Sequence, residues 1–185
     1  MAFLVISTSL NPSSRSRVLA RAGMARIQML GGEADWVDLQ DYDLPLCDGG
    51  GACNHPDAVQ LARKIADAEG VLLAHPVYNF NAASSAKNLI ELTGDAWRDK
   101  VVAIVCAAGG EASYMSHMGI ANSLMLDFRC VIVPRFCHAD EFDFDGDEII
   151  DMKTNARLDE VVAMLVRFAR ALHPLSHESR TSTPM

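Results

Sequence analysis

The sequence lacks the features of membrane proteins and of nucleic-acid-binding proteins. No apolar run approaches the length that crosses a bilayer, and the apolar start, Met1–Ile6, is too short for a secretion signal. Positive charge is scarce, since 16 Lys and Arg face 24 Asp and Glu for a net charge of -8. A surface of that sign repels a phosphate backbone. We therefore expect a cytoplasmic protein that binds neither membranes nor nucleic acid.

Common nucleotide and metal motifs are missing as well. The chain has neither a G-x-G-x-x-G sequence nor a G-x-x-x-x-G-K-[ST] sequence, which excludes the usual dinucleotide and P-loop signatures. Its 5 cysteines are an odd number, and Cys47, Cys53 and His55 do not match the spacing of a structural zinc site. We expect reduced cysteines and no bound metal.

Two other sequence features resemble a metal-binding motif and catalytic residues, but each has a simpler explanation. Asp143–Asp147 is similar to half of a calcium-binding loop, yet its glycine comes too early and the closing Glu is missing. We expect a solvated turn there. His117 and His138 are interpreted as structural or surface residues, so the sequence predicts no catalytic side-chain acid or base.

Short apolar runs alternate with helix-periodic segments along the chain. The runs typical of buried strands lie at 2–7, 34–39, 71–74, 101–106 and 130–133. Helices are predicted at 14–31, from 56 to about 69, at 83–92, from about 114 to 127, and at 155–172. The ending 173–185 contains Pro, Ser and Thr, and we expect it to be a disordered tail after one domain at 1–172.

This alternation predicts an α/β fold, in which helices cover both faces of a parallel sheet. Right-handed crossovers leave few topologies, among them the doubly wound, five-stranded order 2-1-3-4-5. Its switch point lies between the first and third strands, and ligands of such sheets bind in the crevice at that point. The loops that follow these two strands would therefore meet at a binding site.

The loop after the first predicted strand is rich in hydroxyl groups and leads directly into a helix. A helix N-terminus presents free N–H groups and a partial positive charge, which suit a phosphate group. The candidate phosphate ligands are Ser7, Ser9, Asn11, Ser14, Arg15 and Ser16. Ser and Asn also cap helices without any ligand, and that alternative stays open.

Two further loops are suited to contact a ligand. The candidates are Pro76, Val77, Tyr78, Asn79 and Phe80 after the third strand, and Ala108, Gly109 and Gly110 after the fourth. Tyr78 could stack on a flat heteroaromatic ring, although an ordinary strand-to-helix connection can also carry a tyrosine. The two glycines let the backbone approach a ligand edge. Three loops that converge on one crevice are a stronger indication than any one of them.

The residues of these loops resemble the NADPH-dependent FMN reductase family of flavodoxin-like proteins. The resemblance rests on Ser7–Ser16, Pro76–Asn79, Lys87-Asn88 and Ala108–Gly110, and it extends over nearly the whole chain. It implies a three-layer flavodoxin-like fold in which the first loop holds the FMN phosphate. The second loop would border the isoalloxazine ring, and the third would contact the edge of that ring. The resemblance also implies FMN as the cofactor and NADPH or NADH as the co-substrate.

The function implied by the resemblance is that of an NAD(P)H oxidoreductase. Bound flavin would pass electrons from the nicotinamide to a small acceptor, namely free flavin, a quinone, an azo compound or a metal oxyanion. The alternative is a flavodoxin-like electron carrier, which binds FMN without oxidising NAD(P)H. An iron–sulfur flavoprotein is not expected, because Cys47 and Cys53 cannot supply a compact four-cysteine cluster.

Two positions depart from the pattern of this family. Asn11 stands where the family commonly has Arg, which leaves Arg15 or Arg17 to contact the phosphate. Phe80 and Asn81 stand where the family usually has a glycine, and the bulkier pair is expected to narrow the site.

The helix predicted at 83–92 indicates an assembly of subunits. It begins with small residues and continues with Leu89, Ile90 and Leu92, which is more apolar surface than one buried stripe needs. Packing against a second copy of the chain would bury this excess and wall the flavin site. The family resemblance also implies a homodimer or homotetramer.

Overall fold

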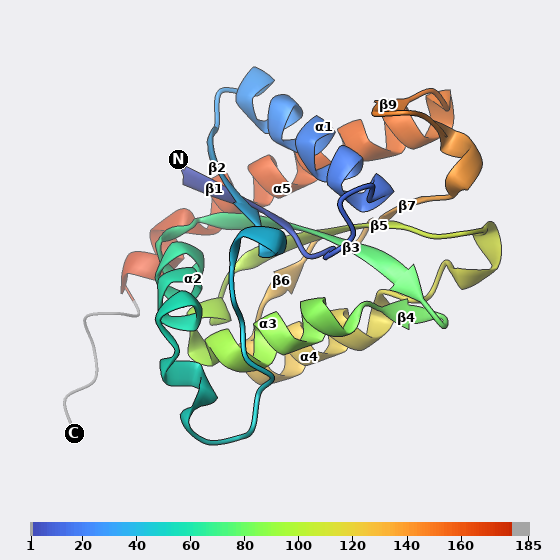
Figure 1. Cartoon of the computed structure of the whole chain (residues 1–185). Coiled ribbons are helices and arrows are strands. Elements are labelled where there is room, and N and C mark those ends of the chain that lie inside the picture. The colour runs from blue at the N-terminus through green and yellow to red at the C-terminus, as the bar shows by residue number, and fades with distance from the viewer. Residues whose placement is uncertain (1, 179–185) are drawn as a thin grey trace.

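A computed structural model describes residues 2–178 and shows a twisted, mostly parallel sheet between two layers of helices (Figure 1). The strands are β1 (Ala2–Ser7), β2 (Glu33–Asp38), β3 (Gly70–Tyr78), β4 (Asn81–Ala82), β5 (Val101–Ala107), β6 (Val131–Ile132), β7 (Cys137–Ala139), β8 (Phe144–Asp145) and β9 (Glu148–Ile149). The helices are α1 (Arg15–Met29), α2 (Pro56–Asp67), α3 (Ser84–Thr93), α4 (Met118–Phe128) and α5 (Met152–Glu178).

The strand order confirms the predicted topology. The main sheet runs β2-β1-β3-β5-β6, and its neighbouring strands are parallel. This is the order 2-1-3-4-5 once the short antiparallel strand β4, which pairs only with β3, is set aside. The switch point between β1 and β3 is therefore present, with the serine loop after β1 and the tyrosine loop at the end of β3.

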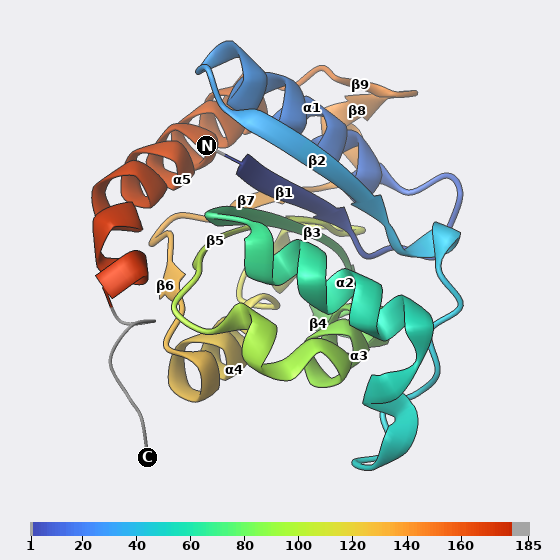
Figure 2. The same cartoon turned by 90° about the vertical axis from the view of Figure 1, so that its left-hand side faces the viewer.

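Alternation along the strands produces two separate cores. Leu72 and Ala74 of β3 face the core that α1 and α5 cover, whereas Val71 and Leu73 face the core that α2, α3 and α4 cover. Figure 2 shows these two helix layers on opposite sides of the sheet. Every central strand is buried on both faces, which explains why it reads as a continuous apolar run rather than as an alternating one.

Helix α1 lies especially close to the sheet. A methyl group on Gly23 would overlap the side chain of Leu72, because the helix backbone passes directly over β3. This close contact fixes the position of α1 and therefore of its N-terminus, which forms one side of the predicted site.

The fifth strand is split, which the apolar run at 130–133 did not predict. Both β6 and β7 pair with β5, and the chain leaves the sheet between them at Pro134. Proline lacks the N–H group that a central ladder needs, so pairing stops there and resumes at Cys137. As a result His138 lies in the sheet, beside Cys106 of β5.

Three other predicted boundaries need correction. Helix α4 begins at Met118, because a 3₁₀ turn at Glu111–Ser113 and an irregular stretch precede it. The acidic turn at 143–147 belongs to a hairpin of β8 and β9. Helix α5 continues to Glu178, so the predicted tail 173–185 begins in a helix, and 179–185 lie outside the described residues.

The apolar residues of α3 are not surplus surface, and the argument that assigned them to a subunit interface is wrong. Leu89, Ile90 and Leu92 are only 0%, 2% and 3% exposed within the single chain. Leu89 and Ile90 belong to the core under α2, α3 and α4. The apolar stripe of α3 is wide because this helix packs against both the sheet and α2.

Candidate functional site

The serine loop and the tyrosine loop are joined at the switch point. Thr8 donates two hydrogen bonds to the carbonyl of Ala74, one from its N–H group and one from its hydroxyl, both at 2.9 Å. The hydroxyl of Ser85, at the start of α3, donates to the carbonyl of Thr8 at 2.6 Å. Residues far apart in the sequence therefore form one rigid junction, and the two predicted ligand loops extend from it.

Most hydroxyl groups of the serine loop are buried at the start of α1. Ser9 and Ser14 are 1% and 8% exposed, and Ser16 is fully buried. The hydroxyls of Ser14 and Ser16 lie 2.8 Å apart. Ser14 is the N-cap residue, yet its side chain makes no hydrogen bond to the N–H groups of the helix. The hydroxyls of Ser14 and Ser16 therefore bond to each other and leave the N–H groups at the start of α1 without a side-chain cap, which suits an anion.

Arg17 organises this loop, a role that sequence reasoning missed. Its buried guanidinium forms an ion pair with Asp38, at the end of β2. It also donates to the carbonyls of Ser9, Asn11 and Pro12 at 3.0, 2.7 and 2.9 Å. The donors of Arg17 are therefore spent on shaping the loop backbone, not directed at a ligand. An acid at the end of the strand next to a hydroxyl-rich loop was the signal available for this pair.

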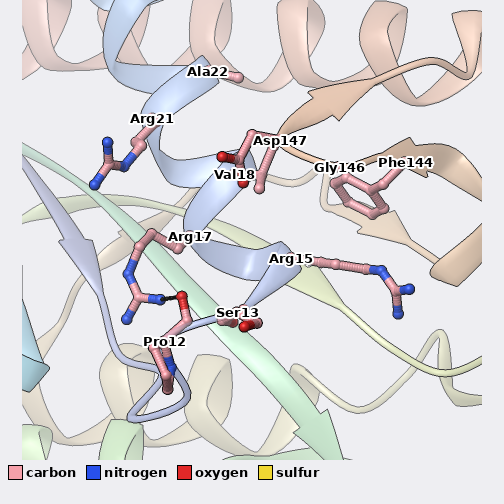
Figure 3. Close-up of a pocket in the computed structure, with 11 residues that line it drawn as sticks. Pro12, Ser13, Arg15, Arg17, Val18, Arg21, Ala22, Phe144, Gly146 and Asp147 are labelled. Atoms are coloured by element: carbon pink, nitrogen blue, oxygen red, sulfur yellow. Dashed lines mark hydrogen bonds between the residues drawn. The ribbon is translucent and has the colours of Figure 1, made fainter.

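Two other polar candidates of this loop, Asn11 and Arg15, lie at its rim. Asn11 is exposed, and its side-chain oxygen accepts a hydrogen bond from the N–H group of Ser13 at 3.0 Å. Arg15 is about half exposed and points toward Glu141, 3.9 Å away. Figure 3 shows its guanidinium on the side of α1 that faces the β8–β9 hairpin, away from Arg17. The structure does not bring Arg15 together with the buried hydroxyls.

An open cleft of about 840 Å³ lies beside the same loop, between the start of α1 and the β8–β9 hairpin (Figure 3). Its walls include Ser13, Ser14 and Arg15 on one side and Phe144 and Asp147 on the other. The tyrosine and glycine loops do not line it. The cleft therefore adjoins the predicted phosphate end of the site and does not include the ring end.

The tyrosine loop is a tight hairpin with two exposed rings. Tyr78 pairs with Asn81 across β3 and β4, which leaves Asn79 and Phe80 as a two-residue turn. Both turn residues have positive φ, 51° and 60°, a geometry in which glycine is the preferred second residue. Phe80 therefore occupies the place of the usual glycine under strain. The rings of Tyr78 and Phe80 are 54% and 70% exposed.

The glycine loop has space that the protein itself does not use. A Cβ atom on Gly109 or Gly110 would meet no atom of the described residues within 4 Å. Neither glycine lies in the left-handed region, and Gly110 is extended with a φ of 172°, so backbone conformation does not require glycine there. Ala108 anchors the loop by donating its N–H group to the carbonyl of Ala139 at 2.9 Å. Open space at two glycines fits a ligand that approaches the backbone.

The predicted residues thus fit FMN at both of its ends. The hydroxyl of Ser7 is buried and has no hydrogen-bond partner among the described residues, so a polar ligand group at the crevice could satisfy it. The buried hydroxyls at the start of α1 suit a phosphate, and the exposed Tyr78 with the open glycine loop suits a flat ring.

Asn88 anchors the long loop that follows β2. Its side chain accepts a hydrogen bond from the N–H group of Cys47 at 2.8 Å and donates to the carbonyl of Pro45 at 2.9 Å. Asp48 closes the glycine-rich part by accepting hydrogen bonds from the N–H groups of Gly50 and Ala52, which lowers the pKa of Asp48. Asn88 and Asp48 therefore hold the backbone of this loop in place.

Within 2–178, no helix is long and apolar enough to cross a bilayer. No group of three or more His, Cys, Asp or Glu in the same residues is arranged to hold a metal ion.

Several solved structures of flavin-dependent oxidoreductases share this fold. An NAD(P)H:(acceptor) oxidoreductase, FerB from Paracoccus denitrificans, superposes with a TM-score of 0.74 at 20% identity, covering 92% of this chain and 97% of that one. RosB, solved with an 8-demethyl-8-formylriboflavin-5'-phosphate intermediate, gives a TM-score of 0.75 at 16% identity, covering 100% and 89%. The order of the sheet and the loops at its switch point define a flavodoxin-like protein.

Sequence comparison identifies the family. Residues 1–143 match the family model of NADPH-dependent FMN reductase, and the chain belongs to this family. A probable NADPH:quinone oxidoreductase of Oryza sativa is 30% identical over 168 residues, 83% of each chain. An NADPH:quinone oxidoreductase of Arabidopsis thaliana is 27% identical over 179 residues, 90% of this chain and 91% of the relative. The protein is an oxidoreductase that uses FMN and NAD(P)H, as the sequence predicted.

Proposed function

We propose that the protein reduces quinones with electrons from NADPH or NADH. The observation that carries this proposal is the similarity to plant NADPH:quinone oxidoreductases over most of both chains. The exposed rings of Tyr78 and Phe80 fit the proposal, because a flat acceptor can stack on them at the mouth of the crevice.

The proposed FMN site divides into a phosphate end and a ring end. The phosphate would bind to the N-terminus of α1 and to Ser9, Ser14 and Ser16, with Asn11 and Arg15 at the rim. The ring would lie between Pro76–Phe80 and Ala108–Gly110, and Ser7 would belong to the phosphate end with the other hydroxyls of the serine loop. Bound FMN would supply the redox chemistry between the nicotinamide and the acceptor. The chain's own groups bind, orient and shield the reactants.

A panel of acceptors tests the proposed reaction. Protein reconstituted with FMN is assayed for oxidation of NADPH and of NADH with a benzoquinone, free FMN, an azo dye and a metal oxyanion. We expect the highest kcat/KM with the quinone. A protein that binds FMN but oxidises neither nicotinamide with any acceptor would instead be an electron carrier.

We also propose a homodimer in which α4 replaces α3 as the contact helix. The outer face of α4 exposes Met118, Met125 and Leu126, which are 40%, 40% and 76% exposed. Tyr114 and Met115 extend this apolar surface toward the glycine loop. A second copy packed here would cover the apolar face and wall the ring end of the site. A tetramer would need a further contact, and the cytoplasmic location remains a prediction from sequence.

Light scattering tests the assembly. We expect at least twice the mass of one chain for the parent protein and one chain mass for Leu126→Glu. The exposed Leu30 offers a matched control, because Leu30→Glu changes an apolar residue away from α4 and should leave the mass unchanged. A monomeric parent with full activity would rule out a site shared between subunits.

A further inference from the structure

Three side chains lie in a row beneath the ring end of the site. His75 of β3 is level with Cys106 of β5, and Cys106 is level with His138 of β7. Residues in register on parallel strands share a face, and these point to the side of the sheet that α2, α3 and α4 cover. His75 directly precedes the tyrosine loop, and Cys106 lies two residues before the glycine loop.

His117 covers this row from the segment that precedes α4. Its ring stacks on Phe136 with centroids 3.6 Å apart, and Tyr114 meets it edge-on at 5.7 Å. Ser116, also buried, approaches the Cys106 thiol, whose pKa burial raises to about 12. The histidine cluster, which we define as His75, His117 and His138, therefore connects the tyrosine loop with the segment after the glycine loop.

The hydrogen bonds of His75 determine which of its nitrogens carries the proton. Nδ1 lies 3.1 Å from the carbonyl of Pro76, and because a carbonyl only accepts, Nδ1 must carry the hydrogen. In the neutral ring Nε2 is then a lone-pair acceptor. This atom is buried and has no hydrogen-bond partner among the described residues.

His117 has the complementary need. Its ring is 1% exposed, and neither of its nitrogens has a hydrogen-bond partner in the described part of the chain. Burial lowers the pKa of His75 and of His117 to about 4, so both rings are neutral near pH 7. A neutral His117 offers one donor and one acceptor, and His75 offers one acceptor. The ring of Tyr114, which contacts His117, also lies 5.8 Å from the ring of His138, so His117 lies close to the row that contains His75.

His138 differs from the two buried rings because it is half-buried and already has a partner. Its Nε2 lies 3.2 Å from the hydroxyl of Ser113, in the turn after the glycine loop. Burial lowers the pKa of His138, while Asp140 and Asp143 raise it. The unmet hydrogen-bonding capacity of the cluster is therefore confined to His75 and His117.

We propose that His75 and His117 bind internal water, and that this water joins the tyrosine loop to the glycine-loop segment and so positions both for the flavin ring. Buried polar groups in proteins are satisfied by ordered water where no protein partner is available, and a water can both donate to two acceptors and accept from a donor. The two histidines are positioning residues in this scheme. The role at the flavin rests on the proposed function, whereas the water site itself does not.

The water site is tested on flavin-free protein labelled with ¹⁵N-histidine. NMR near neutral pH should show His75 as the Nδ1–H tautomer, with an Nε2 shift typical of an accepted hydrogen bond. The ring N–H of His117 should show magnetisation transfer from long-lived water. His55, on the helix-capping loop of α2, is the control and should show neither signal. An Nε2 shift typical of a free lone pair, with no transfer from water, would overturn the proposal.

Two substitutions of His75 separate hydrogen bonding from volume. His75→Gln keeps an acceptor, and we expect it to bind FMN within about threefold of the parent, whereas His75→Phe keeps ring volume alone and should bind about tenfold more weakly. Parent-like binding by His75→Phe would show that the ring only fills space. If His75→Phe does not fold, the pair His117→Gln and His117→Phe makes the same comparison.

The outcomes distinguish this proposal from the proposed function. Inactivity with every acceptor would contradict the quinone proposal, but the water site would still stand if the NMR signals and FMN affinities were as expected. Active enzyme without the water signals would remove the water site alone.

Discussion

The two ends of the proposed flavin site are built on different principles. At the phosphate end, the backbone of the serine loop is held by Arg17, whose guanidinium pairs with Asp38 and binds three carbonyl groups. At the ring end, the tyrosine loop extends into solvent as a strained turn, with Asn79 and Phe80 both at positive φ. One end is fixed by many internal bonds, and the other is fixed by few.

This difference matches what each end would have to do. A phosphate is the same group in every catalytic cycle, so a preorganised loop lowers the entropic cost of binding it. The ring end would receive a nicotinamide and an acceptor in turn, and exposed rings with few bonds can adjust to both. We infer that the phosphate end determines FMN affinity and that the ring end determines which acceptor is used.

The largest effect is expected from breaking the Arg17–Asp38 pair. Arg17→Ala would leave a buried carboxylate without its partner and three carbonyls without donors, and should lower the free energy of unfolding by about 3–5 kcal/mol. Chemical denaturation measures this loss. Arg15→Ala is the matched control, because Arg15 is about half exposed and its removal should cost less than about 1 kcal/mol. Equal losses for both variants would contradict the organising role of Arg17.

The second-largest effect is expected from acid, which should lower the stability of the folded protein through the two buried histidines at the ring end. The pKa values of His75 and His117 are lowered to about 4 in the folded protein, so the unfolded chain binds more protons between about pH 4 and pH 6.5. Their contribution is complete above about pH 6.5 and is lost as the pH falls toward 4.

As the pH falls from 7 to 5, each of the two histidines should lower the free energy of unfolding by about 2 kcal/mol. Denaturation of the parent at both values measures the sum, and His75→Gln should remove about half of the pH dependence. A parent whose stability does not change over this range would contradict the burial of two neutral histidines.

The architecture was predictable because it depends on local patterns. Strands that are buried on both faces appear in the sequence as apolar runs. The loops after β1, β3 and β5 carry hydroxyl, aromatic and glycine residues, which distinguish them from ordinary connections. The site predicted from the sequence did not include the Arg17–Asp38 ion pair. The two partners are 21 residues apart, and only the parallel pairing of β1 with β2 brings them together. The third strand was predicted to end at residue 74, whereas β3 continues through His75 to Tyr78, so the place of His75 within the sheet was also missed.

Burial on α3 was unpredictable for a related reason. The sequence shows that Leu89, Ile90 and Leu92 are apolar, but it does not show how many neighbours a helix has. A helix that packs against both a sheet and α2 buries a wider stripe than a helix with one neighbour, so excess apolar surface in the sequence became core in the fold. On α4 the opposite holds, because apolar residues that could have been core are exposed on its outer face.

A smaller effect would separate ligand binding from helix capping at the phosphate end. Ser14→Ala removes a buried hydroxyl that makes no capping bond but bonds to Ser16, so it should lower the free energy of unfolding by only about 1 kcal/mol. FMN affinity should fall about tenfold, while riboflavin, which has no phosphate, should bind as before. Ser13→Ala is the control, because Ser13 is exposed. Equal loss of affinity for FMN and riboflavin, together with lower stability, would mean that Ser14 only supports the helix.

Adding Ser9→Ala is less informative, because the Ser9 hydroxyl accepts a hydrogen bond from the N–H group of Asn11 and shapes the loop.

The smallest effect concerns the strained turn at the ring end. Glycine adopts positive φ without steric cost, so Phe80→Gly should be more stable than Phe80→Ala by about 1 kcal/mol in thermal or chemical unfolding. Both variants lose the exposed ring and should raise the KM for a quinone by a similar factor, about two- to fivefold, if stacking on Phe80 assists the acceptor. FMN affinity should fall less than in Ser14→Ala, because Phe80 borders only the ring and the phosphate end is unchanged. A tenfold loss of FMN affinity in both variants, with the KM for the quinone unaltered, would reverse the roles assigned to the two ends, since Phe80 would then hold the cofactor rather than select the acceptor.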